Sequence, residues 1–137
     1  MTSKYFTNFG FKGYALTEFH CTHLYLGEVQ PTTLAEIMNV LENFFRTREV
    51  SSFEVSFDQL EILNGRLVLA SNLRDFPKQY TELFTKLTRI QPSEHNFYPH
   101  VTLKVDDSKT TFHGIINRYV LVEKKEKQIT PIYVENL

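Results

Sequence analysis

Apolar residues follow a helical period over one long stretch of the chain. Between Pro31 and Arg48 they recur at intervals of three and four, the spacing that places side chains on one face of an α-helix. Thr33 and Glu36 have the spacing of a capping box, which predicts that they close the first turn. A second helix is expected to start near Asp75, with a proline in its first turn. Its buried side would carry Tyr80, Leu83, Phe84 and Leu87.

Alternating apolar and polar residues predict several short strands outside these helices. Residues 53–57 alternate strictly, which is typical of a strand with one buried face. Two more strands are expected on either side of Asn64-Gly65, a dipeptide that strongly favours a two-residue hairpin turn. These two strands cover residues 60–63 and 66–70. A final hairpin is expected from residues 119–122 and 129–134, with the charged residues 124–127 as its turn.

Two further stretches share a His-x-Thr motif within an apolar, aromatic and β-branched run: residues 19–27 and 97–105. Because side chains alternate between the two faces of a strand, His20 and Thr22 share one face. The same parity joins His100 and Thr102. Each strand therefore presents an imidazole beside a hydroxyl, groups that can exchange protons near neutral pH and donate hydrogen bonds to an oxyanion. Two such strands facing each other would bracket a phosphate.

The order of the expected elements suggests an approximate internal duplication. A motif strand, a helix and strands are followed by a helix, a motif strand and strands. The predicted fold class is α+β, with two pseudosymmetric βαβ-type lobes whose antiparallel sheets face a central cleft and whose helices lie outside. We expect a single domain over residues 1–137, with lobes over about 14–70 and 71–137.

The composition narrows the classes of function. With 42% apolar and 23% charged residues, the chain resembles a soluble globular protein. A formal net charge of −1 argues against a basic surface that coats nucleic acid, although it permits a local positive pocket. The single cysteine, Cys21, allows no intrachain disulfide and fits a reducing compartment. No apolar run has the length of a membrane span and no signal peptide is evident, so we expect a cytoplasmic location.

Other chemistries fit the motif histidines less well. A zinc site would need a third ligand, and His23 lies on the opposite strand face from His20. A hydrolase triad would need a nucleophile, but Cys21 points away from the motif face and no Gly-x-Ser-x-Gly turn occurs. The glycines match no phosphate-binding loop. One His-x-Thr alone is usually structural, but two with the same parity and flanking pattern favour a pair of imidazoles acting as acid and base, with no metal and no cofactor.

The paired motifs resemble those of the 2H phosphoesterase superfamily, the LigT-like or cyclic phosphodiesterase-like proteins, whose signature is His-x-Thr/Ser in each of two lobes. Residues 20–27, His-Cys-Thr-His-Leu-Tyr-Leu-Gly, look like the first motif, and residues 98–103, Tyr-Pro-His-Val-Thr-Leu, look like the second. The resemblance implies a metal-independent phosphodiesterase in which two histidines exchange protons and two threonines contact phosphate oxygens. These residues are His20, His100, Thr22 and Thr102.

The resemblance also bears on the substrate. Compact members of the superfamily occur in viruses and phages, where some degrade nucleotide immune signals. The implied substrates are cyclic oligonucleotides, 2′-5′ oligoadenylates or RNA ends carrying a 2′,3′-cyclic phosphate. We therefore expect a nucleotide or oligonucleotide as the partner, with no membrane and no obligatory protein partner.

The aromatic N-terminus raises a separate hypothesis about substrate binding. Residues 1–12 show no clean period, so they form either an edge strand or a flap that stacks on a base. The flap candidates are Tyr5, Phe9, Phe11 and Tyr14. Beside the second motif, Tyr98 and Lys104 are further candidates for substrate contact.

Two other classes of function stay open at this point. A nucleotide- or RNA-binding module would use the same histidines to contact phosphate without turning it over. A structural or adaptor domain would not bring His20 and His100 to face each other.

Overall fold

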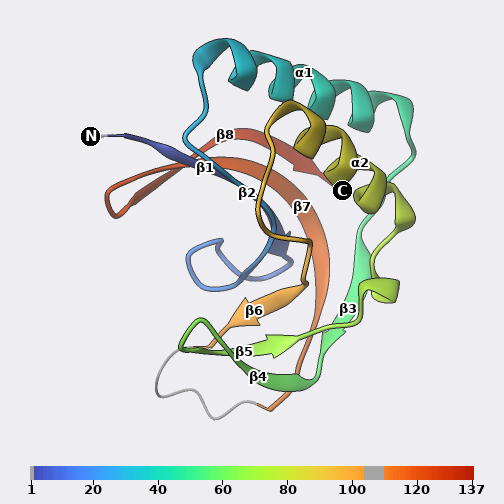
Figure 1. Ribbon diagram of the computed structural model, residues 1–137. Coiled ribbons are helices and arrows are strands. Elements are labelled where there is room, and N and C mark those ends of the chain that lie inside the picture. The colour runs from blue at the N-terminus through green and yellow to red at the C-terminus, as the bar shows by residue number, and fades with distance from the viewer. Residues whose placement is uncertain (1, 104–109) are drawn as a thin grey trace.

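A computed structural model describes residues 2–103 and 110–137 of the chain. Within these residues the chain forms two α-helices, one short 3₁₀ helix and eight strands (Figure 1). The helical elements are α1 (Pro31–Thr47), η1 (Leu73–Asp75) and α2 (Lys78–Ile90). The strands are β1 (Lys4–Phe11), β2 (His20–Gly27), β3 (Phe53–Phe57), β4 (Gln59–Leu63), β5 (Arg66–Ala70), β6 (His100–Thr102), β7 (Phe112–Lys125) and β8 (Gln128–Asn136).

The strands build two antiparallel sheets, which confirms the predicted α+β class. The larger sheet has the order β2-β1-β7-β3, and β8 also pairs with β7. The smaller sheet has the order β4-β5-β6. Strands from residues 14–70 and from residues 71–137 occur in both sheets, so the two sheets do not correspond to the two lobes expected from the order of elements. The chain instead crosses between the sheets, and this crossing brings β6 beside β2.

Helices α1 and α2 lie side by side on one face of the larger sheet (Figure 1). The expected α1 is confirmed, but its first turn differs from the prediction. Gln30 is the N-cap and its side chain makes no capping bond, because the helix begins at Pro31, before Thr33. Proline suits the first position of a helix because a backbone N–H there would have no partner within the helix, so its absence costs no hydrogen bond.

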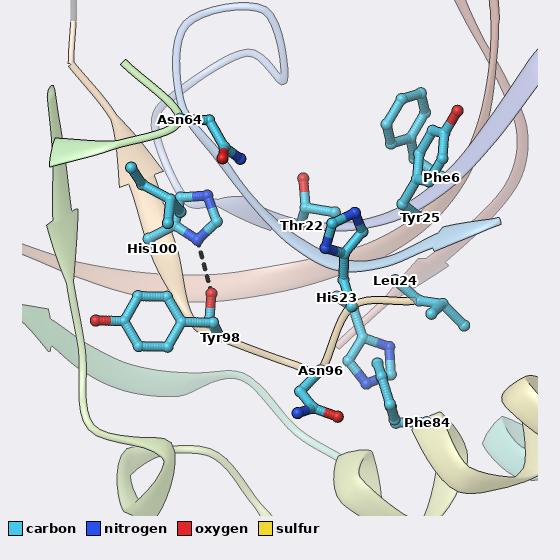
Figure 2. Close-up of a pocket in the computed structure, with 12 residues that line it drawn as sticks. Phe6, Thr22, His23, Leu24, Tyr25, Asn64, Phe84, Asn96, Tyr98 and His100 are labelled. Atoms are coloured by element: carbon cyan, nitrogen blue, oxygen red, sulfur yellow. Dashed lines mark hydrogen bonds between the residues drawn. The ribbon is translucent and has the colours of Figure 1, made fainter. Parts of the chain in front are cut away.

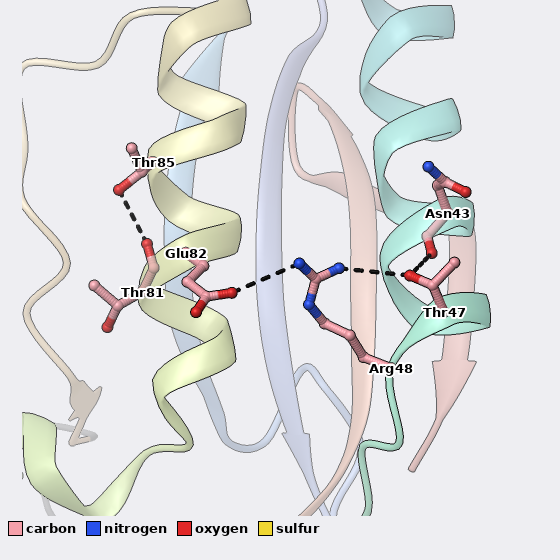
Figure 3. Close-up of polar contacts among 6 residues, drawn as sticks. All are labelled: Asn43, Thr47, Arg48, Thr81, Glu82 and Thr85. Carbon is pink, nitrogen blue, oxygen red and sulfur yellow. Dashed lines mark hydrogen bonds and ion pairs between the residues drawn. The ribbon is translucent and has the colours of Figure 1, made fainter.

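A bridge at the end of α1 joins the two helices (Figure 3). The guanidinium of Arg48 lies 3.6 Å from the carboxylate of Glu82 on α2 and stacks over the Phe44 ring, 5.0 Å from its centroid. Both charged groups are partly exposed, so we assign this pair a modest role in fixing the helix ends.

The predicted turn at Asn64-Gly65 is confirmed. Both residues have positive φ, 51° and 76°, the conformation that a two-residue hairpin turn requires. The second expected hairpin is also present, but its strands are longer than predicted and its turn is reduced to Glu126-Lys127. The tip of the first hairpin matters for function because it reaches the pocket described below.

The N-terminal aromatic segment is a central strand, so the flap hypothesis is wrong. Strand β1 pairs with β2 on one side and with β7 on the other. Phe9 and Phe11 are 0% exposed. A strand covered on both faces shows no alternation in its sequence, which is why residues 1–12 gave no period.

Phe9 stands at the centre of an aromatic core between the large sheet and the helices. Its ring contacts six others: His23, Phe53, Phe76, Tyr80, Phe97 and Tyr119. Aromatic pairs in edge-to-face geometry are worth about 0.5–1.5 kcal/mol each beyond the area that they bury. This core therefore largely explains why 14% of the residues of the chain are aromatic.

His23 is the one imidazole buried in this core among the described residues, with 2% of its surface exposed. Its Nε2 lies 2.9 Å from the Tyr80 carbonyl oxygen, which can only accept, so Nε2 carries the proton. Its Nδ1 lies 2.7 Å from the Tyr119 hydroxyl, which can donate to it. The neutral ring thus satisfies both nitrogens and ties β2 to α2 and β7.

None of the described helices is both long enough and apolar enough to cross a membrane.

We expect the fold to lose stability in mild acid because of His23. Burial lowers the pKa of this ring from 6.5 to about 4, so the unfolded chain takes up a proton over a pH range in which the folded protein does not. The free energy of unfolding should therefore fall as the pH drops from 6.5 towards 4, by up to about 1.4 kcal/mol per pH unit. Denaturant unfolding at a series of pH values measures this slope.

The variant His23→Gln should lose this part of the slope, whereas His113→Gln should retain it, because His113 is exposed. Burial also lowers the pKa of His20, so the comparison of each variant with the wild type isolates the contribution of His23. Equal slopes for His23→Gln and the wild type would contradict this assignment.

Candidate active site

Strand β2 carries the first motif and departs from strict alternation. Its pairing with β1 shifts register at His23 and again at Leu26, since Thr7 pairs with Leu24 but Asn8 pairs with Thr22. Each shift adds one residue to β2, as a β-bulge does. One face of β2 therefore carries His20, Thr22 and Tyr25, all half-buried. Cys21, His23, Leu24 and Leu26 are buried, although His23 and Leu24 also line the pocket described below.

Strand β6 carries the second motif and is short. It pairs with β5, with His100 opposite Ala70 and Thr102 opposite Val68. Val101 between them is fully buried, so the two motif side chains share the opposite face. The motif parity predicted for both strands thus holds in the structure.

A turn before β2 fixes the ring of His20. Its Nδ1 lies 2.9 Å from the Leu16 carbonyl oxygen. The carbonyl can only accept, so Nδ1 carries the proton and Nε2 of the neutral ring is left with a free lone pair.

Arg118 holds this turn against the sheet. Its Nη2 donates to the carbonyls of Phe11 and Tyr14, at 3.0 and 2.6 Å. The guanidinium crosses over Gly10, where an added Cβ would lie 2.9 Å from it. Gly10 pairs with His20, so a glycine at this position lets the arginine reach the turn that orients the motif ring.

The ring of His100 is fixed in the same way. Its Nδ1 lies 2.7 Å from the Tyr98 carbonyl oxygen. Figure 2 marks this hydrogen bond with a dashed line. Nδ1 again carries the proton and Nε2 is left available. Both motif histidines therefore have one nitrogen bound to a main-chain carbonyl, and within residues 2–103 and 110–137 no hydrogen bond engages the other.

The two motif histidines interact electrostatically. Burial is the main cause that lowers the pKa of His20 below its ordinary value, and the Leu16 carbonyl partly opposes this effect. The positive charges of His100 and Lys124 lower that pKa further. The His20 ring is therefore neutral at pH 7, the state in which it can accept a proton.

A pocket of about 570 Å³, called here the aromatic pocket, opens beside these residues. Figure 2 shows Tyr98 and His100 on one side of it and Phe6 and Tyr25 on the other, with Thr22 between them. The rings of Phe6 and Tyr25 lie 4.8 Å apart at their centroids, tilted by 58°. The volume of the pocket falls in the range of small-molecule sites.

A second space of about 330 Å³, the polar pocket, adjoins the first. The two pockets share Leu63, Asn64 and His100. Beyond these, the polar pocket is lined by Arg66, Val68 and Thr102. His20 lines neither pocket, although it shares a strand face with Thr22.

The predicted substrate contacts have different outcomes. Tyr98 lines the aromatic pocket, is 41% exposed and donates its hydroxyl to Glu61. Phe9 and Phe11 are buried in the core and cannot reach a ligand there. The Tyr5 hydroxyl donates to Glu123 at 2.9 Å, away from this pocket.

Tyr14 likewise packs away from the pocket. Its ring contacts Phe19 and Phe112, at centroid distances of 5.2 and 5.6 Å. Lys104 lies outside the residues that the structure describes.

Several pocket residues were not predicted from the sequence. The aromatic ones are Phe6, Tyr25 and Phe84, and the polar ones are Asn64, His95 and Asn96. Phe6 sits opposite Tyr25 across the β1–β2 pair, so the correct register would have placed both on the motif face. The bulge at His23 hides this signal, because strict alternation assigns Tyr25 to the core.

Among the described residues, no three His, Cys, Asp or Glu side chains gather closely enough to hold a metal ion. His23, the remaining histidine on β2, is occupied by Tyr80 and Tyr119 in the core.

The fold has close counterparts among solved structures. Escherichia coli LigT in complex with 3′-AMP superposes with a TM-score of 0.64 and 17% sequence identity, over 100% of this chain and 99% of LigT. A structure described as a phosphoesterase gives 0.65 and 15%, over 98% of each chain. The protein TT0787 of Thermus thermophilus gives 0.64 and 15%, over 98% of this chain and 97% of its own.

This chain has the same fold as LigT. The resemblance inferred from the two motifs is thereby confirmed at the level of the fold. No model of a known protein family matches the sequence, and no curated protein matches it.

Replacing His100 should change the titration of His20. The charge on His100 lowers the pKa of His20, so His100→Ala should raise that pKa towards its ordinary value. Titration of the imidazole protons by NMR measures the shift directly. His113→Ala, near the start of β7 beside Ser56, should leave the titration of His20 as it is. An unchanged pKa in His100→Ala would show that the two motif rings are not neighbours in solution.

Proposed function

We propose that this protein is a metal-independent phosphodiesterase of the 2H type, acting on a phosphodiester of ribonucleotide origin. The observation that carries the proposal is the matched pair of imidazoles. His20 and His100 stand on strands that come together from different sheets, and each is anchored through Nδ1 to a carbonyl. Such anchoring fixes the tautomer and aims Nε2, as acid–base catalysis requires.

The reaction needs one proton acceptor and one proton donor. His20 is neutral at pH 7 and is suited to remove the proton from an attacking ribose 2′-hydroxyl or water. His100 in its charged form would protonate the oxygen that leaves as the new P–O bond forms and the old one breaks. General acid–base catalysis of this kind contributes about 10²–10⁴-fold for each group.

The motif threonines are suited to stabilise the phosphate. Thr22 lines the aromatic pocket with His100, and Thr102 lines the polar pocket with the same ring. Hydroxyls at these positions can donate to the non-bridging oxygens as negative charge grows in the transition state. The scissile phosphate would therefore lie at the junction of the two pockets.

The aromatic pocket suits a base. Phe6, Tyr25 and Tyr98 offer ring faces, and Asn64 and Asn96 offer amide groups to the edge of a base. E. coli LigT has been solved with 3′-AMP and with ATP, which supports a nucleotide as the ligand of this fold. Cyclic oligonucleotide immune signals, 2′-5′ oligoadenylates and RNA 2′,3′-cyclic phosphates all combine a base with a phosphodiester beside a ribose.

A nucleotide-binding module without turnover is the alternative function. The two are separated by incubating the protein with 2′,3′-cyclic nucleotides, 2′-5′ oligoadenylates and cyclic di- and trinucleotides, with and without a chelator, and analysing the products by chromatography. Product from at least one substrate, formed equally in the chelator, supports the enzyme. Binding without product supports the module.

We expect His20→Ala and His100→Ala each to lower kcat by about 10²–10⁴-fold, because each removes one proton-transfer group. The wild-type rate should be bell-shaped in pH, since one ring must be neutral and the other charged, and the two apparent pKa values belong to the pair. His113→Ala provides the matched control for loss of an imidazole. A rate that rises steadily into alkaline pH, or a His100→Ala variant that is as active as the wild type, would contradict the assigned roles.

Two phenylalanines of β1 give opposite expectations. Phe6→Ala should weaken nucleotide binding, since base–aromatic stacking is worth about 1–3 kcal/mol per base, and should change the melting temperature little. Phe9→Ala should lower stability by about 3–5 kcal/mol through a cavity in the core, while binding per folded molecule stays the same. Calorimetric titration and thermal melts measure both quantities. If Phe6→Ala binds nucleotides as the wild type does, the base does not occupy the aromatic pocket.

A further inference from the structure

Two pockets meet at the ring of His100, and their linings differ in chemistry. On one side of this ring, the aromatic pocket holds Phe6, Tyr25 and Thr22. The polar pocket extends past His100 to Thr102 and Arg66. A phosphate held between the two motifs would sit at their shared wall, which leaves most of the polar pocket unfilled by the scissile group.

Arg66 is placed to bind an anion in the polar pocket. It lies on β5 two residues before Val68, so it shares the face that Val68 and Thr102 form with His100. Within the described part of the chain, no hydrogen bond or ion pair engages its guanidinium. Arginine presents paired N–H donors that match a phosphate, so an unpaired one beside a phosphate site has a clear use.

The other polar groups of this pocket are compatible with an anion. Asn64 and Thr102 supply an amide and a hydroxyl, and the lining residues include no carboxylate among those described. Glu61 pairs with Val68 and so points to the same face, but its carboxylate accepts the hydroxyl of Tyr98.

We propose that the polar pocket is a second phosphate subsite, in which Arg66 binds a phosphate adjacent to the scissile one. The protein would thereby prefer linear or cyclic oligonucleotides to 2′,3′-cyclic mononucleotides. An oligonucleotide places its base in the aromatic pocket, its scissile phosphate at the two histidines and a neighbouring phosphate at Arg66. A cyclic mononucleotide has one phosphate and leaves this subsite empty. This inference rests on the proposed function, because it takes the motif pair as the site of cleavage.

Binding and turnover test the subsite separately. Affinity is measured by calorimetric titration with 2′-O-methyl dinucleotides, which lack the attacking hydroxyl: ApA, and the same molecule with one extra phosphate, pApA or ApAp. The wild type should bind at least one extended form about tenfold or more tightly than ApA, as expected for a charge-assisted hydrogen bond. In Arg66→Gln this advantage should disappear, while the affinity for ApA is retained.

Arg74→Gln is the matched control, because it removes the same charge from the exposed η1 segment. It should keep the full advantage of the extra phosphate. In turnover assays, Arg66→Gln should lower kcat/KM for an oligonucleotide about tenfold or more. Its kcat/KM for 2′,3′-cyclic AMP should stay within about twofold of the wild-type value.

The outcomes that overturn the subsite differ from those that overturn the enzyme. Equal wild-type affinity for ApA and both extended forms would refute the subsite, whether or not the protein is active. If Arg66→Gln lowered kcat/KM equally for all substrates, the subsite would also be refuted, because Arg66 would then act on the scissile phosphate itself. If no substrate is cleaved but the extra phosphate still strengthens binding through Arg66, the proposed hydrolysis fails and the subsite stands.

Discussion

The site depends on a bulge in β2 that the core holds in place. At His23 the strand β2 has one more residue than β1. Beyond His23, side chains that strict alternation would assign to one face of β2 therefore lie on the other. Strict alternation after Thr22 would turn Tyr25 into the core, whereas in the structure Tyr25 is half-buried and lines the aromatic pocket together with Leu24. The bulge persists because both nitrogens of the His23 ring form hydrogen bonds in the core, one with the Tyr80 carbonyl of α2 and one with the Tyr119 hydroxyl of β7. A buried hydrogen-bond pair in the core thus decides which side chains a ligand would meet on the other face.

The two motif histidines share a proposed function, but their surroundings in the structure differ. Both are anchored through Nδ1, yet the carbonyl of Leu16 precedes His20 by four residues and that of Tyr98 precedes His100 by two. His20 is set back from both pockets, and His100 forms a wall of each. Burial is the main cause of the lowered pKa of His20. The approximate repeat of the motif therefore places the two histidines in different surroundings, and those of His20 favour its neutral form.

Local patterns in the sequence were sufficient to predict most of the elements and the motif pair. The period of α1, the Asn64-Gly65 turn and the two His-x-Thr motifs each depend on residues close in the chain. They can therefore be recognised from a short stretch of sequence alone. The pocket was not predictable in this way. Phe6 and Tyr25 meet only through a shifted register between strands, and Arg66 joins Thr102 only because β5 pairs with β6. The position of β1 was missed for a related reason, since a strand buried on both faces carries no alternation to read.

Local charge matters more here than the charge of the whole chain. A net charge of −1 gives no general attraction for a polyanion, so any selection of phosphate must come from cations placed at particular points. Arg118 is engaged by main-chain carbonyls and Arg48 by Glu82, which leaves neither free for a ligand. Arg66, at the foot of the Asn64-Gly65 turn, has no such partner among the described residues. The turn that gives β4 and β5 their register also sets the arginine beside the second motif, so a local sequence signal for a hairpin positions the charge that a neighbouring phosphate would need.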